Sequence, residues 1–312
     1  MKIKYFVCQS IISLFFTLSA YTLWAQIPNG YYDAIEGKKD KDLKTALYQI
    51  ISNNGFKVVG YSGLWDAYKD TDARPDGKVW DMYSNTSNFT FVTDQDKGSG
   101  GTIEGDKYNR EHSFPQSWFE KASGDMKSDL FNVYPTDKLV NNKRSNYPYG
   151  ETNGEIYKSD NGFSKLGTCT FPEYSGTVFE PNDQYKGDFA RIYMYMVTCY
   201  ENFSEKWTGN SVNQLDNNTY PVFENWTIKM LLEWCEKDPV DDWEIARNDK
   251  VYKIQGNRNP FVDHPELAEY IWGDKTDTEW YPEDNNEPAI ISPKDKSEID
   301  LGGIRNDLVG KV

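Results

Sequence analysis

Apolar residues recur at helical spacing in several stretches of the chain. In residues 41–53 they are Leu43, Ala46, Leu47, Ile50 and Ile51. In residues 182–202 they are Phe189, Ile192, Tyr193, Met196, Val197 and Tyr200. Spacings of three and four residues align side chains on one face of a helix, so both stretches are predicted to be helices that pack on a core. The sequence predicts two more helices, one around Trp226, Met230 and Trp234 that ends at Asp238-Pro239, and one over residues 241–254.

Two other stretches interrupt this pattern. Residues 72–105 are polar and rich in glycine, with Arg-Pro-Asp-Gly at 74–77 and Gly-Ser-Gly-Gly at 98–101. These are turn signals, and we expect short strands joined by loops there. From about Glu283 the chain becomes charged and amide-rich. Residues 284–312 are therefore predicted to be a linker and tail, or the start of a further accessory module.

The first residues have the layout of a secretory signal peptide. Lys2 and Lys4 precede an apolar run from Ile11 to Trp24, and the small residue Ala25 follows. The run contains four serine or threonine residues and is short for a bilayer span. We therefore expect residues 1–25 to be removed on export, leaving a secreted or periplasmic protein without a membrane attachment. Residues 26–283 are the predicted folded domain.

The charge of the chain is strongly acidic. It carries 49 acidic and 34 basic residues, for a formal net charge of −15. Such a surface repels nucleic acid over most of its area, which disfavours a high-affinity nucleic-acid binder. It does not exclude a nuclease, because a divalent cation and a few local arginines can supply positive charge where a phosphate lands.

The cysteines give little support to a disulfide or zinc framework. Without residues 1–25 the chain has Cys169, Cys199 and Cys235. This odd number permits at most one intramolecular disulfide, and the spacing matches no zinc pattern. Stability must come mainly from a core, which the aromatic content of 15% can build.

Glu111 next to His112 is the main candidate for chemistry, and His112 is one of two histidines in the chain. A carboxylate beside an imidazole can provide a metal ligand and a general base for phosphodiester hydrolysis. The amide-rich stretch 129–151 offers neutral oxygen ligands. However, a lone histidine is more often a packing or surface residue, and Asn141 and Asn142 could simply flank a turn.

Seven blocks in chain order decide between these interpretations. They are Tyr-Tyr-Asp at 31–33, Trp-Asp-Met-Tyr at 80–83, Asn-Arg-Glu-His-Ser-Phe-Pro at 109–115, Tyr-Pro-Thr-Asp at 134–137, Val-Asn-Asn-Lys-Arg-Ser-Asn at 140–146, Lys-Gly-Asp-Phe-Ala-Arg at 186–191 and Gln-Gly-Asn-Arg-Asn-Pro-Phe-Val-Asp-His-Pro-Glu at 255–266. With these blocks the chain resembles the secreted bacterial endonuclease I family, whose core is a ββα-metal, or His-Me finger, nuclease site. The resemblance extends over nearly all of residues 28–272.

The resemblance implies an α+β fold, a mainly helical single domain around a ββα-metal finger. The hairpin of the finger should carry Glu111 and His112, and its helix should carry Asn141. His112 matches the general base, and we expect its pKa to lie near neutrality. Glu111 and Asn141 match the ligands of one divalent cation, with Mg²⁺ as the expected ion. The cation would stabilise the transition state and the leaving oxygen, giving 5′-phosphate products.

Some residues are less clearly assigned. Arg110 is predicted to contact substrate, and Arg144 either contacts a phosphate or pairs with an acid inside the fold. His264 and the run Asn257-Arg258-Asn259 are expected to be structural. Relatives often carry cysteines before the Glu-His block and histidines at positions matching Phe131-Asn132 and Cys235, and this chain has neither. We expect activity to persist with a supporting hydrogen bond missing.

The predicted function is that of a secreted, metal-dependent nuclease that cleaves DNA and/or RNA with little sequence specificity. Nucleic acid is the predicted partner, and no protein partner is predicted. The alternative is a catalytically inactive extracellular binding protein, for example for glycans, that uses the 10 tryptophans and 22 tyrosines as contact surface. The sequence leaves the preferred polymer, the native metal and the oligomeric state open.

Overall fold

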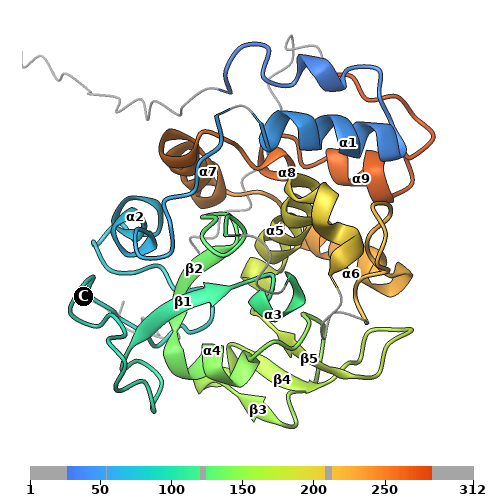
Figure 1. Ribbon diagram of the computed structural model, residues 1–312. Helices are drawn as coiled ribbons and strands as arrows, with labels where there is room; N and C mark the ends of the chain where they lie inside the picture. The colour runs from blue at the N-terminus through green and yellow to red at the C-terminus, as the bar shows by residue number, and fades with distance from the viewer. Residues whose placement is uncertain (1–26, 54, 120–123, 208–212, 283–312) are drawn as a thin grey trace, which may run out of the picture.

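A computed structural model describes residues 27–53, 55–119, 124–207 and 213–282 (Figure 1). The longer helices are α1 (Asp40–Ile51), α2 (Leu64–Thr71), α4 (Lys138–Arg144), α5 (Lys186–Cys199), α6 (Asn225–Lys237), α7 (Asp242–Gln255) and α9 (Leu267–Trp272). The short helices are η1 (Asp33–Ile35), α3 (Gln116–Phe119), η2 (Asp160–Gly162), η3 (Asp183–Tyr185), η4 (Glu201–Lys206) and α8 (Pro260–Asp263). The strands are β1 (Tyr108–His112), β2 (Val133–Asp137), β3 (Tyr157–Lys158), β4 (Lys165–Thr168) and β5 (Thr177–Glu180). This is the α+β class that the sequence predicted, while the predicted signal peptide and tail lie outside the described residues.

Helix α5 is the centre of the helical part. It packs against α1, α6 and α8, and Figure 1 shows it between these helices. All of its residues are buried, because neighbours cover every side and not only the apolar stripe. The four predicted helices are confirmed by α1, α5, α6 and α7.

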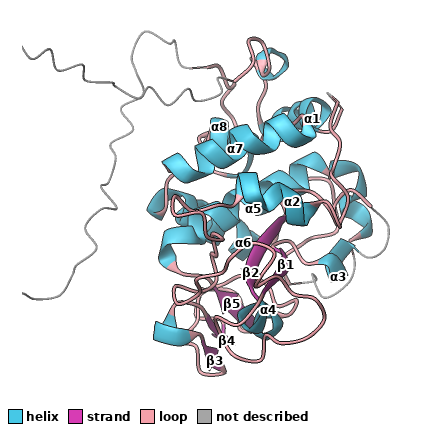
Figure 2. Cartoon of the chain, turned by 90° about the vertical axis from the view of Figure 1, so that its left-hand side faces the viewer, coloured by secondary structure: helices cyan, strands magenta, loops and turns pink. Residues whose placement is uncertain are grey.

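The strands form two small antiparallel sheets. Strand β1 pairs with β2, which places Glu111 opposite Tyr134 and His112 opposite Val133. Strands β3, β4 and β5 form the second sheet in that order. In Figures 1 and 2 both sheets and α4 lie toward one end of the molecule, and most of the longer helices lie toward the other.

The prediction of short strands in residues 72–105 is wrong. The described structure has no strand there and only isolated bridges, Ala73 to Val79 and Gln95 to Tyr108. Aspartate side chains instead accept hydrogen bonds from nearby backbone N–H groups, as Asp81 does from Tyr83 and Asp96 from Gly98. Such local bonds replace the ladder that a strand would need.

The segment after α7 is structural, as the sequence indicated. Arg258 is buried and forms an ion pair with Asp263, and the Asn259 side chain caps α8 by accepting from the Phe261 N–H. The His264 ring lies edge-on to the rings of Tyr32 and Trp280. No helix in the described part of the chain is long and apolar enough to span a bilayer.

Candidate active site

Strand β1, strand β2 and helix α4 form one continuous unit around the candidate residues. Helix α4 starts at the residue after β2 ends, because Asp137 closes the strand and caps the helix. Its Oδ1 accepts from the backbone N–H groups of Leu139 (2.8 Å) and Val140 (3.0 Å). This fixes the direction in which α4 leaves the strand.

Hydrogen bonds from two side chains of α4 join it to β1. Asn109 and Glu111 are two residues apart on the strand and share a face, and Asn141 and Arg144 are three apart on the helix. The Asn141 Nδ2 donates to Asn109 Oδ1 at 2.8 Å, and the Arg144 Nη1 donates to Glu111 Oε1 at 2.6 Å. Glu111 and Asn141 therefore face the same strand–helix interface, with Glu111 on β1 and Asn141 on α4 as predicted.

Glu111 is buried but keeps one oxygen available. Its Oε1 accepts from both the Tyr83 hydroxyl (2.8 Å) and the Arg144 guanidinium (2.6 Å). Neither of these two hydrogen bonds falls on Oε2. Burial raises the pKa of Glu111, and the charge of Arg144 opposes that rise. The carboxylate is thus fixed by one oxygen while the other can bind a ligand.

Arg144 requires a correction. It is fully buried, and besides Glu111 it donates to the backbone carbonyls of His112 (2.8 Å) and Ser113 (2.7 Å). Of the two roles that the sequence left open, the structure shows the ion pair with an internal acid. A side chain without exposed surface cannot contact an external phosphate, so the substrate-binding prediction for Arg144 is wrong.

The environment of His112 determines which nitrogen can act as a base. Its Nε2 lies 3.1 Å from the backbone carbonyl oxygen of Lys127. A carbonyl only accepts, so Nε2 carries the proton and Nδ1 is unprotonated in the neutral ring. Burial lowers the pKa of His112 to about 4, and the nearby charges of Lys127, Arg144 and Arg110 contribute. This is below the near-neutral value that we expected, and it keeps the imidazole neutral at physiological pH.

Arg110 lies two residues before His112 on β1. It is partly exposed, and its guanidinium carbon is 3.5 Å from the centre of the Tyr61 ring and 4.4 Å from that of Trp65. Its Nη1 donates to the Tyr61 carbonyl at 2.7 Å. The position is compatible with the predicted substrate contact, which remains a prediction.

The donor set suits a hard cation that keeps much of its water. No group of three or more histidine, cysteine, aspartate or glutamate side chains in the described chain could hold a metal ion. A cation at Glu111 would therefore have one carboxylate and the amide oxygen of Asn141 from the protein. Mg²⁺ binds in this way, through one or two carboxylates and several waters. An available carboxylate oxygen, an amide and a neutral imidazole on a strand–helix unit are typical of a hydrolytic site.

The comparisons with known proteins give the family. The family model described as Endonuclease I matches residues 40–266, so the chain belongs to the endonuclease I family and is a nuclease. It is 36% identical over 247 residues to a protein named extracellular ribonuclease from Bacillus subtilis, covering 78% of each chain. It is 29% identical over 142 residues to a protein named extracellular deoxyribonuclease from Aeromonas hydrophila, covering 44% of this chain and 50% of that one.

Several residues that build the site were not singled out from the sequence. Tyr83 and Asn109 lie inside matched blocks, but nothing in a single sequence shows which block residues touch Glu111 or Asn141. Tyr61 lies far before His112 in the chain, and its ring is nearly parallel to the imidazole (14°, centres 5.9 Å apart). Lys127 holds His112 through its backbone carbonyl, which any residue type could supply.

Proposed function

We propose that this protein is a secreted, metal-dependent nuclease that cleaves DNA and/or RNA with little sequence specificity and leaves 5′-phosphate ends. In this proposal β1, β2 and α4 are the ββα-metal, or His-Me, finger. The observation that supports it best is the meeting of Glu111 and Asn141 at one interface, with the neutral imidazole of His112 next to Glu111 on β1.

Each residue has a role that its environment supports. Nδ1 of His112 takes the proton of the attacking water, because Nε2 is held by Lys127. Glu111 Oε2 and the Asn141 amide oxygen hold one divalent cation, with Mg²⁺ the best fit to hard oxygen donors. When bound, that cation supplies positive charge for the phosphate and the leaving oxygen. Tyr83 and Arg144 fix the Glu111 carboxylate through its other oxygen.

The names of the relatives support the substrate class and the location. Two Bacillus relatives are named extracellular ribonucleases, and Aeromonas relatives are named extracellular or periplasmic deoxyribonucleases. We infer that this chain acts on nucleic acid outside the cytoplasm, exported by the predicted signal peptide at residues 1–25. Parallel digestion of RNA and DNA of equal length will decide which polymer it prefers.

Degradation of plasmid DNA and of total RNA, with Mg²⁺ or with EDTA, tests the proposal. We expect cleavage with Mg²⁺, none with EDTA, and none by the His112→Ala variant in either buffer. Activity that survives chelation contradicts the metal-dependent mechanism. No activity on either polymer with Mg²⁺ favours the aromatic-rich binding protein, which the structure supports poorly because no tryptophan in the described residues is exposed.

A further inference from the structure

Arg110 differs from the other arginines in the described part of the chain. Five of the six form an ion pair: Arg74 with Asp76, Arg144 with Glu111, Arg191 with Glu244, Arg247 with Asp72, and Arg258 with Asp263. Arg110 forms none with any described carboxylate. In a chain with 49 acidic residues, an arginine without a carboxylate partner is unusual.

Arg110 is held in place without being neutralised. Its guanidinium lies against the Tyr61 and Trp65 rings, and one N–H group donates to the Tyr61 carbonyl. The aromatic rings and the carbonyl orient the planar group. A guanidinium has five N–H donors, and the others make no hydrogen bond with the described protein. They are oriented in advance and remain available to a ligand.

A second cation lies at the same ring. The Lys127 Nζ is 4.8 Å from the centre of Tyr61, its side chain is partly exposed, and no described carboxylate forms an ion pair with it. Tyr61 therefore contacts Arg110 and Lys127 and also lies nearly parallel to the His112 ring. Two positive charges that form no ion pair with a described carboxylate therefore lie against the ring that is stacked on the proposed base.

Packing alone explains this arrangement poorly. Two like charges brought together repel each other. A structural cation in an acidic chain would be expected to form an ion pair with a carboxylate, as the five paired arginines do. An anion that arrives from outside and is shared by both cations removes the repulsion. Next to a phosphodiester hydrolysis site, the anion of suitable chemistry is a phosphate of the nucleic-acid backbone.

We propose that Arg110, Tyr61 and Lys127 form a phosphate clamp, in which the two cations bind a backbone phosphodiester adjacent to the one that is cleaved and Tyr61 sets their spacing. The inference rests on the proposed nuclease function and adds Lys127 as a substrate-binding residue and Tyr61 as a positioning residue. The clamp recognises the backbone and not the bases, which fits cleavage with little sequence specificity.

The test is binding without cleavage. A fluorescein-labelled, single-stranded oligothymidylate is titrated with the full chain in EDTA, and anisotropy gives the affinity at several salt concentrations. The plot of log affinity against log salt loses about 0.7 of slope for each phosphate contact removed from a single strand. We expect a smaller slope for Arg110→Gln and for Lys127→Gln, and a slope about 0.7 smaller for the double variant, because both cations bind the same phosphate.

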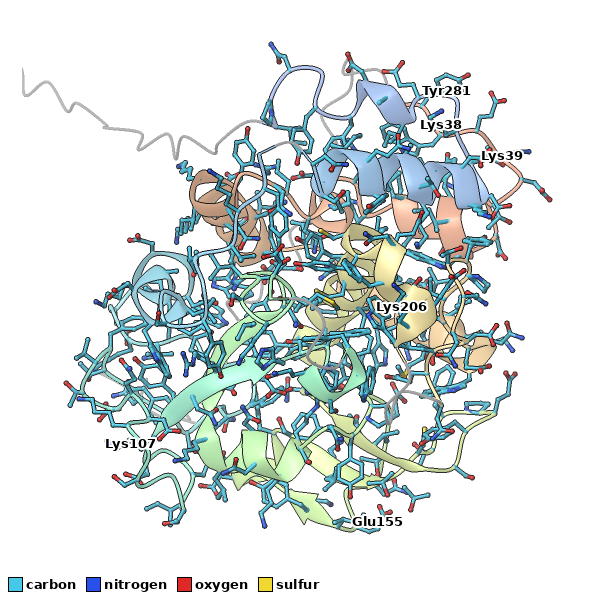
Figure 3. The ribbon with its side chains drawn as sticks, in the orientation of Figure 1. Lys38, Lys39, Lys107, Glu155, Lys206 and Tyr281 are labelled. Atoms are coloured by element: carbon cyan, nitrogen blue, oxygen red, sulfur yellow. The ribbon has the colours of Figure 1, made fainter. Side chains whose placement is uncertain are left out.

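The chain offers a matched control. Lys206 is an exposed lysine at the end of η4, and Figure 3 shows it well away from Lys107, which immediately precedes β1. Lys206→Gln removes the same charge from a surface lysine outside the proposed clamp and should leave the slope unchanged. Arg110→Lys should restore most of the slope. Tyr61→Leu should weaken binding although both charges remain, and it should raise KM more than it lowers kcat.

The outcomes separate the clamp from the nuclease function. If the wild type cleaves with Mg²⁺ but Lys127→Gln and Arg110→Gln keep the wild-type slope, the clamp is wrong and the nuclease stands. If Lys206→Gln lowers the slope as much as they do, binding is diffuse and the clamp is likewise rejected. If the wild type neither binds nor cleaves, both proposals fail. Lys127→Gln is not expected to disturb the fold around His112, because the hydrogen bond to His112 comes from the Lys127 backbone carbonyl, which the substitution keeps.

Discussion

The described part of the chain contains two arginine–glutamate ion pairs that differ in how many carboxylate oxygens accept hydrogen bonds. They are Arg144–Glu111 and Arg191–Glu244. All four side chains are buried. Glu244 uses both oxygens, accepting from Arg191 Nε (2.8 Å) and Nη2 (2.5 Å). Glu111 uses one oxygen for Arg144 and Tyr83. The Arg191–Glu244 pair is closed and can only hold helices α5 and α7 together, whereas the Arg144–Glu111 pair is open toward a ligand.

This difference shows how a fold can bury a reactive carboxylate. A buried charge must be paired, and pairing both oxygens would leave Glu111 unable to bind a cation. Placing both donors on one oxygen satisfies the need for a partner and keeps the other oxygen available. The candidate site differs from the core in the number of carboxylate oxygens that are hydrogen-bonded, and not in the burial of the ion pair.

Matched glutamine substitutions should separate the two pairs most clearly. Glu111→Gln and Glu244→Gln each leave a buried arginine without its carboxylate, so each should lose about 3–5 kcal/mol of unfolding free energy. Only Glu111→Gln should also lower the activity of the folded protein, by about 10³-fold, because it removes the charged cation ligand. Urea unfolding and kcat/KM at a temperature where both variants remain folded measure the two effects. Equal activities would show that the open oxygen of Glu111 has no function.

The His112 imidazole tests the same site without touching an ion pair. His112→Ala should lower kcat by about 10²–10⁴-fold, the range for loss of a general base. Both arginine pairs remain, so thermal unfolding should change far less than with either glutamine variant. A loss of only a few-fold in kcat would mean that another group accepts the proton.

Asn109 should matter through the orientation of Asn141. Because Asn141 Nδ2 donates to Asn109 Oδ1, the Asn141 amide oxygen is left for the cation. Asn109→Ala should weaken cation binding by about 10–100-fold, as loss of a group that orients a ligand does. Asn109→Asp keeps the acceptor and should bind the cation nearly as well as the wild type. Titration with Tb³⁺, read by sensitised luminescence, measures this independently of cleavage, and equal affinities for Asn109→Ala and the wild type would rule out the orienting role.

The pH dependence should show the smallest effect. A base works when it is unprotonated, and the pKa of His112 is lowered to about 4. The ring therefore stays mostly neutral at pH 5, where an ordinary imidazole with a pKa of about 6.5 would be almost fully protonated. With saturating Mg²⁺, kcat should fall less than about two-fold from pH 7 to pH 5 and drop steeply only near pH 4. A loss centred near pH 6.5 would contradict this.

The sequence predicted the helices and the placement of the three candidate residues, but not the details of the site. Apolar spacing is a local signal, so α1, α5 and α6 could be predicted from it. The contacts of Tyr83, Asn109 and Tyr61 depend on segments that meet only in the folded chain. The role of Arg144 and the lowered pKa of His112 depend on burial, which a single sequence does not reveal at one position.

The direct passage from β2 into α4 also limits how the chain can vary. Asp137 is both the last residue of the strand and the cap of the helix, so no spacer absorbs a change in length. One residue inserted after Asp137 would turn α4 by about 100° relative to the strand, and Asn141 would no longer face Asn109. Related sequences should therefore accept insertions in the loop before β1 far more readily than at this junction.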